Sequence, residues 1–255
     1  MPKLTVIGCS SGNPHPRLAC SCYLLQAGQQ RILLDIGEGA SSAMQRLGHD
    51  PRRINAVVIS HLHADHVMGL PLFIQWNYIL KRRSRLDIYA PSEAVAGIKS
   101  LFDLTYLYPL KLSFPIQIHP INPGGEFSIG AVKVKAHPNS HLQRHRQLLT
   151  GSGKPNQAQC YSFVVQASRR RLVYSSDLGQ AADLTGILAA TNLLVVEASH
   201  VDFAALGSLL RTAGVTLVLV THTDVGFDSQ SARRELLRWG VRQIRLAREG
   251  LELDL

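Results

Sequence analysis

Short apolar runs rich in valine, isoleucine and leucine recur along the chain and are bounded by polar or turn-forming residues. Runs of this length and composition predict β-strands. The predicted strands span residues 4–8, 31–37, 56–60, 86–90, 114–119, 131–136, 161–166, 171–177, 192–198 and 216–222. The segment EFSIGAVKV also predicts a hairpin that turns at Gly130.

Between these runs, apolar residues recur at the spacing of an amphipathic helix. The predicted helices span residues 39–48, 69–81, 92–104, 202–214 and 228–240. Asp202 and Asp228 are the expected N-caps of the last two, and Gly214 and Gly240 their expected ends. This alternation predicts an α/β (or α+β) fold with sheets covered by helices. Residues 141–159 are expected to form a long loop, and residues 1–255 a single domain.

The composition sets limits on the class of protein. A chain of 255 residues with 45% hydrophobic content can bury a large core. No apolar run approaches the roughly 18 to 20 residues that span a bilayer, and the start lacks a secretory signal. We therefore expect a cytoplasmic protein with no membrane partner. The four cysteines are sparse and irregularly placed, which predicts free thiols and no disulfide framework.

The chain is strongly basic, with a net charge of +9 and a sequence pI of about 9.7. Basic clusters occupy residues 81–85, 144–146, 169–171 and 233–248. Such clusters either keep a surface solvated or attract phosphate and nucleic acid. Charge alone does not decide between these functions, so the choice depends on the chemistry of the site.

Five predicted strands share one feature: each has an ionisable residue at or next to its carboxyl end. These residues are Asp35, His61, Asp177, Glu197 and His222. In sheets flanked by helices, sites form beyond the carboxyl ends of the strands. One histidine at a strand end is usually structural, but five such endings predict a functional site at one rim.

The densest cluster is SHLHADH, which follows the predicted strand 56–60. Alternate side chains of an extended segment share a face, so His61 and His63 can bind one ion together. Asp65 and His66 follow the turn into the next helix and suit a second ion. Imidazole and carboxylate ligands favour zinc, with manganese or iron as alternatives.

Two metal ions need more ligands than this cluster offers, including a carboxylate that bridges them. Asp177 is the expected bridge, and His222 completes the second site. The first site needs one more histidine, for which His137, His141 and His145 are candidates in KAHPNSHLQRH. The residues alone leave His137 and His141 nearly equal.

The motifs LLDIGEG, SHLHADH, PNSH, YSSDLG and LVTHTD occur in an order that resembles the metallo-β-lactamase-fold hydrolases. The resemblance implies a four-layer αββα sandwich with a dinuclear site, and it assigns the third histidine to His141. It also makes Asp177 the bridging ligand, where true β-lactamases have a cysteine, which argues against β-lactam hydrolysis. The diiron redox branch has a glutamate at the position of His63, which argues against redox chemistry.

Within that superfamily, IGCSSGNP, LLDIGEGASSAMQRLG and VVEASH are similar to segments of ribonuclease Z and the small cyclic-phosphate phosphodiesterases. His200 stands 22 residues before His222. This resembles the spacing in ribonuclease Z between its non-ligand catalytic histidine and its last histidine ligand. The long tRNA-binding arm of ribonuclease Z is missing, because only ASRRR separates the two predicted strands where it would lie. An insertion lies at residues 142–159 instead. This departure argues against a role in maturing tRNA 3′ ends.

The resemblance implies a phosphodiesterase that cleaves a nucleotide, a cyclic phosphate or an RNA end with a hydroxide bridging two metal ions. Asp65 would ligate the second ion and accept the proton of the nucleophile. His200 would protonate the leaving group or hydrogen-bond a phosphoryl oxygen. Glu197 is expected to orient His200 or another histidine, and Asp35 to orient a ligand histidine or the loop around Gly37.

Two other functions compete with this one. A thioester or lactone hydrolase similar to glyoxalase II would share all seven metal ligands but would need neither His200 nor the basic surface. A nucleic-acid-binding scaffold would use its metal site for structure only. In the favoured function, Arg144 and Arg146 of the insertion are expected to hold an anionic substrate such as a nucleotide or RNA. The resemblance is also compatible with a homodimer.

Overall fold

The computed structural model describes all 255 residues, and the chain divides into two compact units. The N-terminal unit comprises residues 3–122 and 248–253, and the C-terminal unit comprises residues 1–2, 123–247 and 254–255. Each unit is built around one seven-stranded sheet. The single domain over residues 1–255 stays a prediction.

The sheet of the N-terminal unit has the strand order β14-β1-β2-β3-β4-β5-β6. Its strands are β1 Lys3–Gly8, β2 Cys22–Ala27, β3 Gln30–Leu34, β4 Ala56–Val58, β5 Leu86–Pro91, β6 Ile116–Ile121 and β14 Glu252–Asp254. The strands β1 to β3 are antiparallel, and β3 to β6 are parallel. The carboxyl ends of β3 and β4 therefore lie at the same edge of this sheet.

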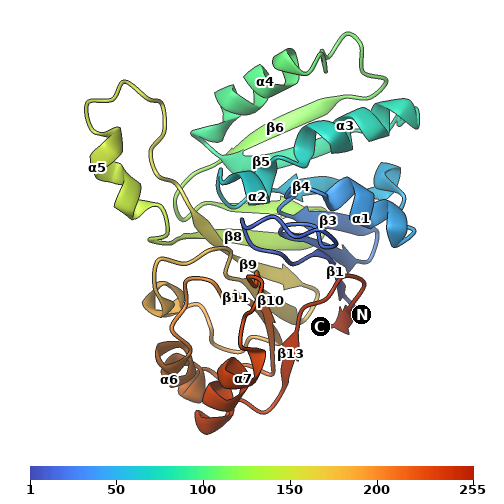
Figure 1. Cartoon of the computed structure of the whole chain (residues 1–255). Helices are drawn as coiled ribbons and strands as arrows, with labels where there is room; N and C mark the ends of the chain where they lie inside the picture. The colour runs from blue at the N-terminus through green and yellow to red at the C-terminus, as the bar shows by residue number, and fades with distance from the viewer. The chain divides into compact units, whose positions relative to one another are not determined.

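Helices cover one face of this sheet (Figure 1). They are α1 Ala40–Arg46, α2 Ala64–Val67, α3 Leu70–Ile79 and α4 Ala94–Leu104, with a short 3₁₀ helix at Pro51–Arg53. Val57 and Ile88 of the sheet share a fully buried cluster with Phe73 and Ile74 of α3. Burial of this apolar face is what holds the helices on the sheet.

The sheet of the C-terminal unit has the order β13-β12-β11-β10-β9-β8-β7. Its strands are β7 Glu126–Ile129, β8 Val132–Pro138, β9 Tyr161–Ala167, β10 Arg170–Tyr174, β11 Leu193–Glu197, β12 Leu217–Thr221 and β13 Ile244–Leu246. The strands β7 to β10 are antiparallel, and β10 to β13 are parallel. The hairpin of β7 and β8 turns at Gly130, whose φ is 57°, as predicted.

The helices of the C-terminal unit are α5 Arg146–Leu149, α6 Phe203–Ala213 and α7 Ser229–Arg238, with 3₁₀ helices at Gln143–His145 and Ala181–Leu184. The helices α6 and α7 lie side by side, and their buried residues share a cluster with β11 and β12 (Figure 1). The predicted N-caps are confirmed, because Asp202 and Asp228 each accept two main-chain N–H bonds. Gly214 ends α6 with a φ of 69°, whereas α7 ends at Arg238, before Gly240.

The α/β class is confirmed as two mixed sheets flanked by helices. The five predicted strand ends belong to two sheets, since β3 and β4 lie in one and β10 to β12 in the other; that they form one functional site stays a prediction. Two predictions need correction. The strands β2, β13 and β14 were missed, and the expected loop 141–159 contains a 3₁₀ helix and α5. None of the helices is long and apolar enough to cross a membrane.

Candidate metal centre

Three imidazoles cluster after β4 in the N-terminal unit. The ring centroid of His61 lies 4.7 Å from that of His63 and 4.2 Å from that of His66. His63 keeps an extended backbone as the N-cap of α2, so His61 and His63 stay in an extended segment as predicted. The short helix α2, separate from α3, holds Asp65 and His66 and was not predicted.

Asp35 and Ser60 fix the orientation of two of these rings. His66 Nδ1 lies 2.7 Å from Asp35 Oδ2, which also accepts the Ser60 hydroxyl at 2.8 Å. Because a hydroxyl has one proton, the 3.0 Å contact between Ser60 Oγ and His61 Nδ1 requires the imidazole to donate. Both rings thus have the proton on Nδ1, and their Nε2 lone pairs are in the tautomer that a metal needs. Asp35 thus holds His66, one of the predicted ligands, in a fixed orientation.

Asp65 forms a pair with His66. Its Oδ2 lies 3.5 Å from His66 Nε2. This separation is close to the about 3.3 Å between two ligand atoms that each lie about 2.0–2.1 Å from one tetrahedral ion. Glycines make room for the aspartate: a Cβ at Gly12 would lie 3.3 Å from the Asp65 carboxylate, and one at Gly37 would lie 2.0 Å from its carbonyl oxygen. The spacing therefore suits two donors to one ion.

In the C-terminal unit, Asp177 lies between two histidines. Its Oδ2 is 3.6 Å from His141 Nε2, and its Oδ1 is 3.4 Å from His222 Nε2. All three residues are at most 4% exposed. One carboxylate oxygen facing each imidazole is the arrangement expected of a carboxylate that bridges two ions.

The structure places His141, and not His137, beside Asp177. His141 lies on the loop after β8, and its Nδ1 is 3.4 Å from the carbonyl oxygen of Leu178. His137 lies within β8, paired with Ser162 and half-exposed. Of the two histidines that the residues alone left open, His141 is the one that lies beside Asp177, and its function as a metal ligand stays a prediction.

Asp183 links the loops of His141 and Asp177, and the sequence did not single it out. Its carboxylate accepts four hydrogen bonds, from the main chain and hydroxyl of Ser140 and from the main-chain N–H groups of Gly179 and Gln180. Gln180 and Asp183 form a capping box at the start of the 3₁₀ helix Ala181–Leu184, and such a cap can be recognised in a sequence. The second function of Asp183, which is to join two distant loops, cannot be recognised there.

Glu197 and His200 lie next to these ligands. Glu197 Oε2 accepts the main-chain N–H groups of Ser199 at 2.6 Å and His200 at 2.8 Å, and it lies 3.4 Å from His200 Nδ1. His200 Nδ1 is 4.0 Å from Asp177 Oδ2, and its ring centroid is 4.8 Å from that of His141. The His200 side chain is 31% exposed, so solvent reaches it but not the neighbouring histidines.

The Glu197 carboxylate raises the pKa of His200 through its interaction with the imidazole, against the effects of burial and of the Arg144 charge. His200 is therefore more readily protonated than an ordinary histidine. A partly exposed, protonated imidazole beside buried acceptors can deliver a proton to a bound molecule. The prediction that Glu197 orients His200 agrees with this geometry.

Backbone strain coincides with the strand ends. Asp35, Ser176 and His222 have φ values of 56°, 53° and 54°, in the left-handed region that non-glycine residues seldom adopt. Asp35 lies directly after β3 and His222 directly after β12, and Ser176 lies shortly after β10, next to Asp177. Strain of this kind, of order 1–3 kcal/mol each, concentrates where side-chain direction matters for function.

Both units therefore offer donors that suit a divalent metal ion. All are imidazoles or carboxylates, most are buried, and several have a protein group that fixes their tautomer. The donors are His61, His63, Asp65 and His66 in the N-terminal unit, and His141, Asp177 and His222 in the C-terminal unit.

Known proteins similar in sequence include enzymes named ribonuclease Z. The chain is 31% identical over 139 residues to ribonuclease Z of Ignicoccus hospitalis, a match that covers 54% of this chain and 45% of that protein. It is 37% identical over 117 residues to ribonuclease Z of Metallosphaera sedula, covering 46% and 39%. The match spans less than half the length of these curated relatives.

Solved structures share the fold over the whole chain. The metallo-beta-lactamase fold protein YhfI from Bacillus subtilis has a TM-score of 0.81 at 20% identity, covering 99% of this chain and 98% of that one. The short form of human tRNase Z has a TM-score of 0.75 at 18% identity, with the same coverage. Residues 30–223, most of the sequence, match the family model of the beta-lactamase superfamily domain. The chain therefore has the metallo-β-lactamase fold and belongs to the beta-lactamase superfamily.

Proposed function

We propose that this protein is a metal-dependent phosphodiesterase that cleaves a nucleotide, a cyclic phosphate or an RNA-end phosphodiester. The observation that carries the proposal is the partly exposed His200 beside the buried Asp177 and His141. A thioester or lactone hydrolase would not need this additional histidine. The relatives named ribonuclease Z support the same substrate class.

We propose that the donors of the two units complete one dinuclear site. The donor chemistry favours zinc over manganese or iron. His61, His63 and His141 would hold the first ion, Asp65, His66 and His222 the second, and Asp177 both. Two divalent ions supply positive charge at the phosphoryl oxygens and lower the pKa of water, which yields a nucleophile near neutral pH.

The remaining chemistry belongs to side chains of the protein. Hydrolysis forms one phosphorus–oxygen bond to the water oxygen and breaks another to the leaving oxygen. His200 donates its proton to the leaving oxygen, which general acid catalysis accelerates by roughly 10² to 10⁴-fold. Glu197 holds His200 in place and raises the pKa of its imidazole, which favours the protonated form. Asp65 accepts the proton that the nucleophile loses.

Arg144 and Arg146 would hold the anionic substrate. Both are exposed, and neither forms an ion pair with a carboxylate. Arg144 lies close enough to His200 for its charge to lower the pKa of that imidazole. With a net charge of +9, the protein attracts phosphodiesters at low ionic strength. Substrate binding should therefore weaken as salt is added.

The decisive experiment measures hydrolysis of bis(p-nitrophenyl) phosphate by metal-analysed wild type and His200→Ala. We expect turnover by wild type, and a kcat about 10²-fold lower in the variant with unchanged metal content. His137→Ala is the matched control, because this histidine lies in the same unit but within β8. It should keep both metals and full activity, whereas His141→Ala should lose metal.

S-lactoylglutathione and a lactone serve as competing substrates. If the metal-loaded protein cleaves one of these and leaves the diester untouched, the phosphodiesterase proposal fails and the alternative hydrolase replaces it. If His200→Ala keeps full diester activity, the substrate class stands but the assigned function of His200 is wrong. Salt-sensitive RNA binding without turnover under any divalent metal would indicate the scaffold.

A homodimer and a cytoplasmic location complete the proposal. Leu72 and Ile79 of α3 and Met68, which lies between α2 and α3, are exposed apolar residues, and Trp76 is partly exposed on α3. A group of exposed apolar side chains suits a protein interface. Light scattering should give the mass of a dimer for the wild type and that of a monomer for Leu72→Glu. A monomeric wild type excludes the dimer.

The proposed cytoplasmic location is tested by cell fractionation.

A further inference from the structure

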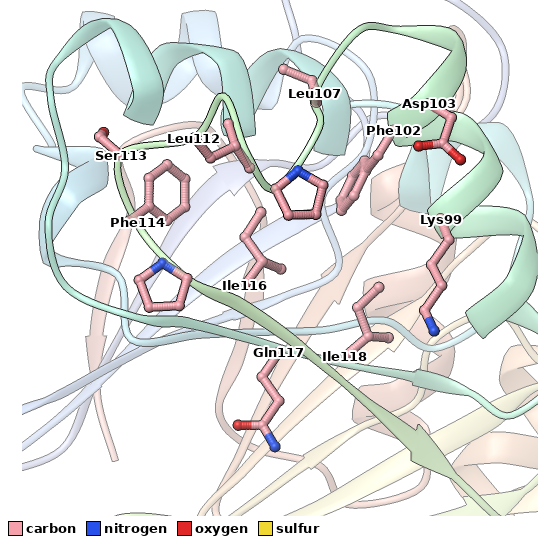
Figure 2. A pocket seen from close by; sticks show the side chains of 12 residues that line it. Lys99, Phe102, Asp103, Leu107, Leu112, Ser113, Phe114, Ile116, Gln117 and Ile118 are labelled. Atoms are coloured by element: carbon pink, nitrogen blue, oxygen red, sulfur yellow. The ribbon is translucent and has the colours of Figure 1, made fainter.

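A groove of about 810 Å³ lies on the N-terminal unit, apart from the histidine cluster (Figure 2). One wall is α4, the other is the connection 105–115, and the floor is β6. Figure 2 shows the side chains of Ile116 and Ile118 on β6 below Phe102 of α4, with Phe114 at one end and Lys99 at the other. Its volume falls in the range of ligand-binding sites, and its lining is mainly apolar.

The end of α4 and the connection that borders the groove expose large apolar side chains. Leu104 at the end of α4 and Tyr106, Tyr108 and Leu110 of the connection are 77%, 66%, 40% and 102% exposed, within seven residues of sequence. Single exposed apolar residues are normal, but a group of four beside an apolar groove indicates an interaction surface.

The floor of the groove is an open sheet edge. β6 is the last strand of its sheet and pairs only with β5. Leu86 N–H donates to Pro115 O and Ser92 N–H to Ile121 O, so in this parallel register residues 115, 117, 119 and 121 direct their main-chain groups toward β5. Ile116 and Ile118 therefore direct their N–H and C=O groups away from the sheet, while their side chains face the groove.

Proline limits how far another strand could extend along this edge. Pro120 also faces away from β5 and has no N–H to offer. Pro115 precedes the strand. The available pairing positions are thus Ile116 and Ile118, with the Pro120 carbonyl as one further acceptor. This is room for a short extended segment of about four to five residues.

Charge is distributed unevenly along the groove. At the end formed by Phe114, the segment 81–85 lies close by, because the Ser113 hydroxyl donates to Arg82 O at 2.8 Å. Lys81 and Arg83 of this segment are exposed and form no ion pair. At the other end, Lys99 is accompanied by the single acidic residue of the lining, Asp103. The Phe114 end is therefore the cationic end.

We infer that this groove binds an extended peptide segment of a partner protein by adding it to β6 as a strand. The main chain of the peptide would bond with Ile116 and Ile118, and its alternate apolar side chains would fill the groove below α4. Acidic residues at one end of the peptide would face Lys81 and Arg83. This interaction surface uses none of the proposed metal ligands and is independent of the phosphodiesterase activity.

Residue-resolved amide exchange by NMR tests the inference with the peptide EEVTVTV as the probe. In the free protein, the amides of Ile116 and Ile118 should exchange fast, while Gln117 and His119 are protected by β5. Peptide addition should slow exchange at Ile116 and Ile118 and leave Gln117 unchanged. A peptide KKVTVTV with the same apolar pattern should bind at least about 5-fold more weakly, since its flank repels the cationic end.

Two variants sharpen the test by fluorescence anisotropy of the labelled peptide. Ile118→Pro removes one outward N–H without removing a bond to β5, and it should weaken binding by roughly 5-fold or more. Ser100→Glu is the control on α4 outside the groove lining and should bind like wild type. Unchanged thermal stability and diester turnover verify that each variant is folded.

Three results would overturn the inference. The first is no binding of EEVTVTV up to about 1 mM, the range of weak specific complexes. The second is binding without slower exchange at Ile116 and Ile118, because the peptide would then contact another surface. The third is a wild-type dimer that Ile118→Glu converts to a monomer, because the groove would then be occupied by a second copy of this chain.

Discussion

At the scale of single residues, Asp183 sets the geometry of the proposed ligands in the C-terminal unit. Four donors from the loops of His141 and Asp177 converge on its carboxylate. Gly179 allows the close approach, since a Cβ there would lie 2.2 Å from Ser140 Oγ. The loops cannot separate without breaking these bonds. Asp183 therefore positions the two loops that hold the proposed ligands His141 and Asp177.

Asp183→Asn should weaken metal binding by roughly 10- to 100-fold, because the amide replaces an acceptor oxygen with a donor that faces other donors. A chelator competition assay with Zn²⁺ measures the affinity, and the thermal transition verifies the fold. Asp228→Asn is the matched control, since it changes an N-cap of the same unit into another good N-cap. Equal zinc affinity in wild type and Asp183→Asn would contradict the assignment.

The cysteines should be unreactive in the folded protein. All four are free and buried. Burial, helped by Glu249, raises the pKa of Cys9 to about 12, and burial with the Asp65 charge raises that of Cys20 to about 11. The thiolate is the reactive form, so disulfide-exchange reagents at pH 8 should react at least about 100-fold more slowly than with unfolded protein. Fast titration of even one native thiol would contradict this prediction.

The same shifts determine a pH dependence. Between about pH 9 and pH 11 the unfolded chain releases thiol protons that the folded chain keeps. The unfolded state then binds fewer protons, so the free energy of unfolding falls as pH rises through this window. Urea unfolding at pH 8 and pH 10 checks the sign, and a more stable protein at pH 10 would contradict it.

At the scale of elements, sequence periodicity located most strands and helices because their apolar faces are nearly continuous. β2 was missed because CYLLQA adjoins the irregular segment 9–21, and β13 and β14 because strands of three residues show no period. The strand ends at Asp35, His61 and His222 were visible because one polar residue follows an apolar run. Which sheet each strand joins is decided by long-range pairing, which no local pattern records.

The choice between His137 and His141 shows the same limit. His137 lies near the end of β8 and His141 on the loop after it, so the course of the chain after Pro138 separates the two. That course depends on Asp183, which lies 43 residues after Ser140 and accepts its N–H, and on Asn139, whose Oδ1 accepts the His141 N–H. Family resemblance favoured His141, the histidine that lies beside Asp177, where the local pattern left both histidines open.

The connection between α3 and β5 depends on one buried cation. Arg82 is 2% exposed and has no carboxylate partner, and burial lowers its pKa to about 10, so it stays charged at neutral pH. Its guanidinium donates to five acceptors, namely Pro51 O, Ile54 O, Asn77 Oδ1, Ser84 O and Arg85 O. These bonds join three separate segments of the N-terminal unit.

Arg82→Met should lower the free energy of unfolding by about 3 kcal/mol, because several buried carbonyl groups lose their donor. Arg83→Met is the control, since its side chain is exposed and the change should stay within about 0.5 kcal/mol. Urea unfolding measures both. A change below about 1 kcal/mol in Arg82→Met would show that water replaces the guanidinium.

At the scale of the whole molecule, the proposed ligands come from both compact units. A metal that binds only the folded chain stabilises it by about 4 kcal/mol at 1,000 times its Kd. For a chain of this length, 1 kcal/mol corresponds to about 2–4 °C in Tm. Removing the metal with a chelator should therefore lower Tm by about 10 °C, and Zn²⁺ should restore it.

Single-ligand variants decide whether the two donor sets act together. If they complete shared sites, His63→Ala from the N-terminal unit and His141→Ala from the C-terminal unit, which would hold the same ion, should each remove much of the Zn²⁺-dependent rise in Tm. The effects would then be non-additive, because the double variant would lose little more than either single variant. If each set bound an ion alone, the two losses would add. A Tm that Zn²⁺ does not change would refute the dinuclear site itself, whichever unit supplied the ligands.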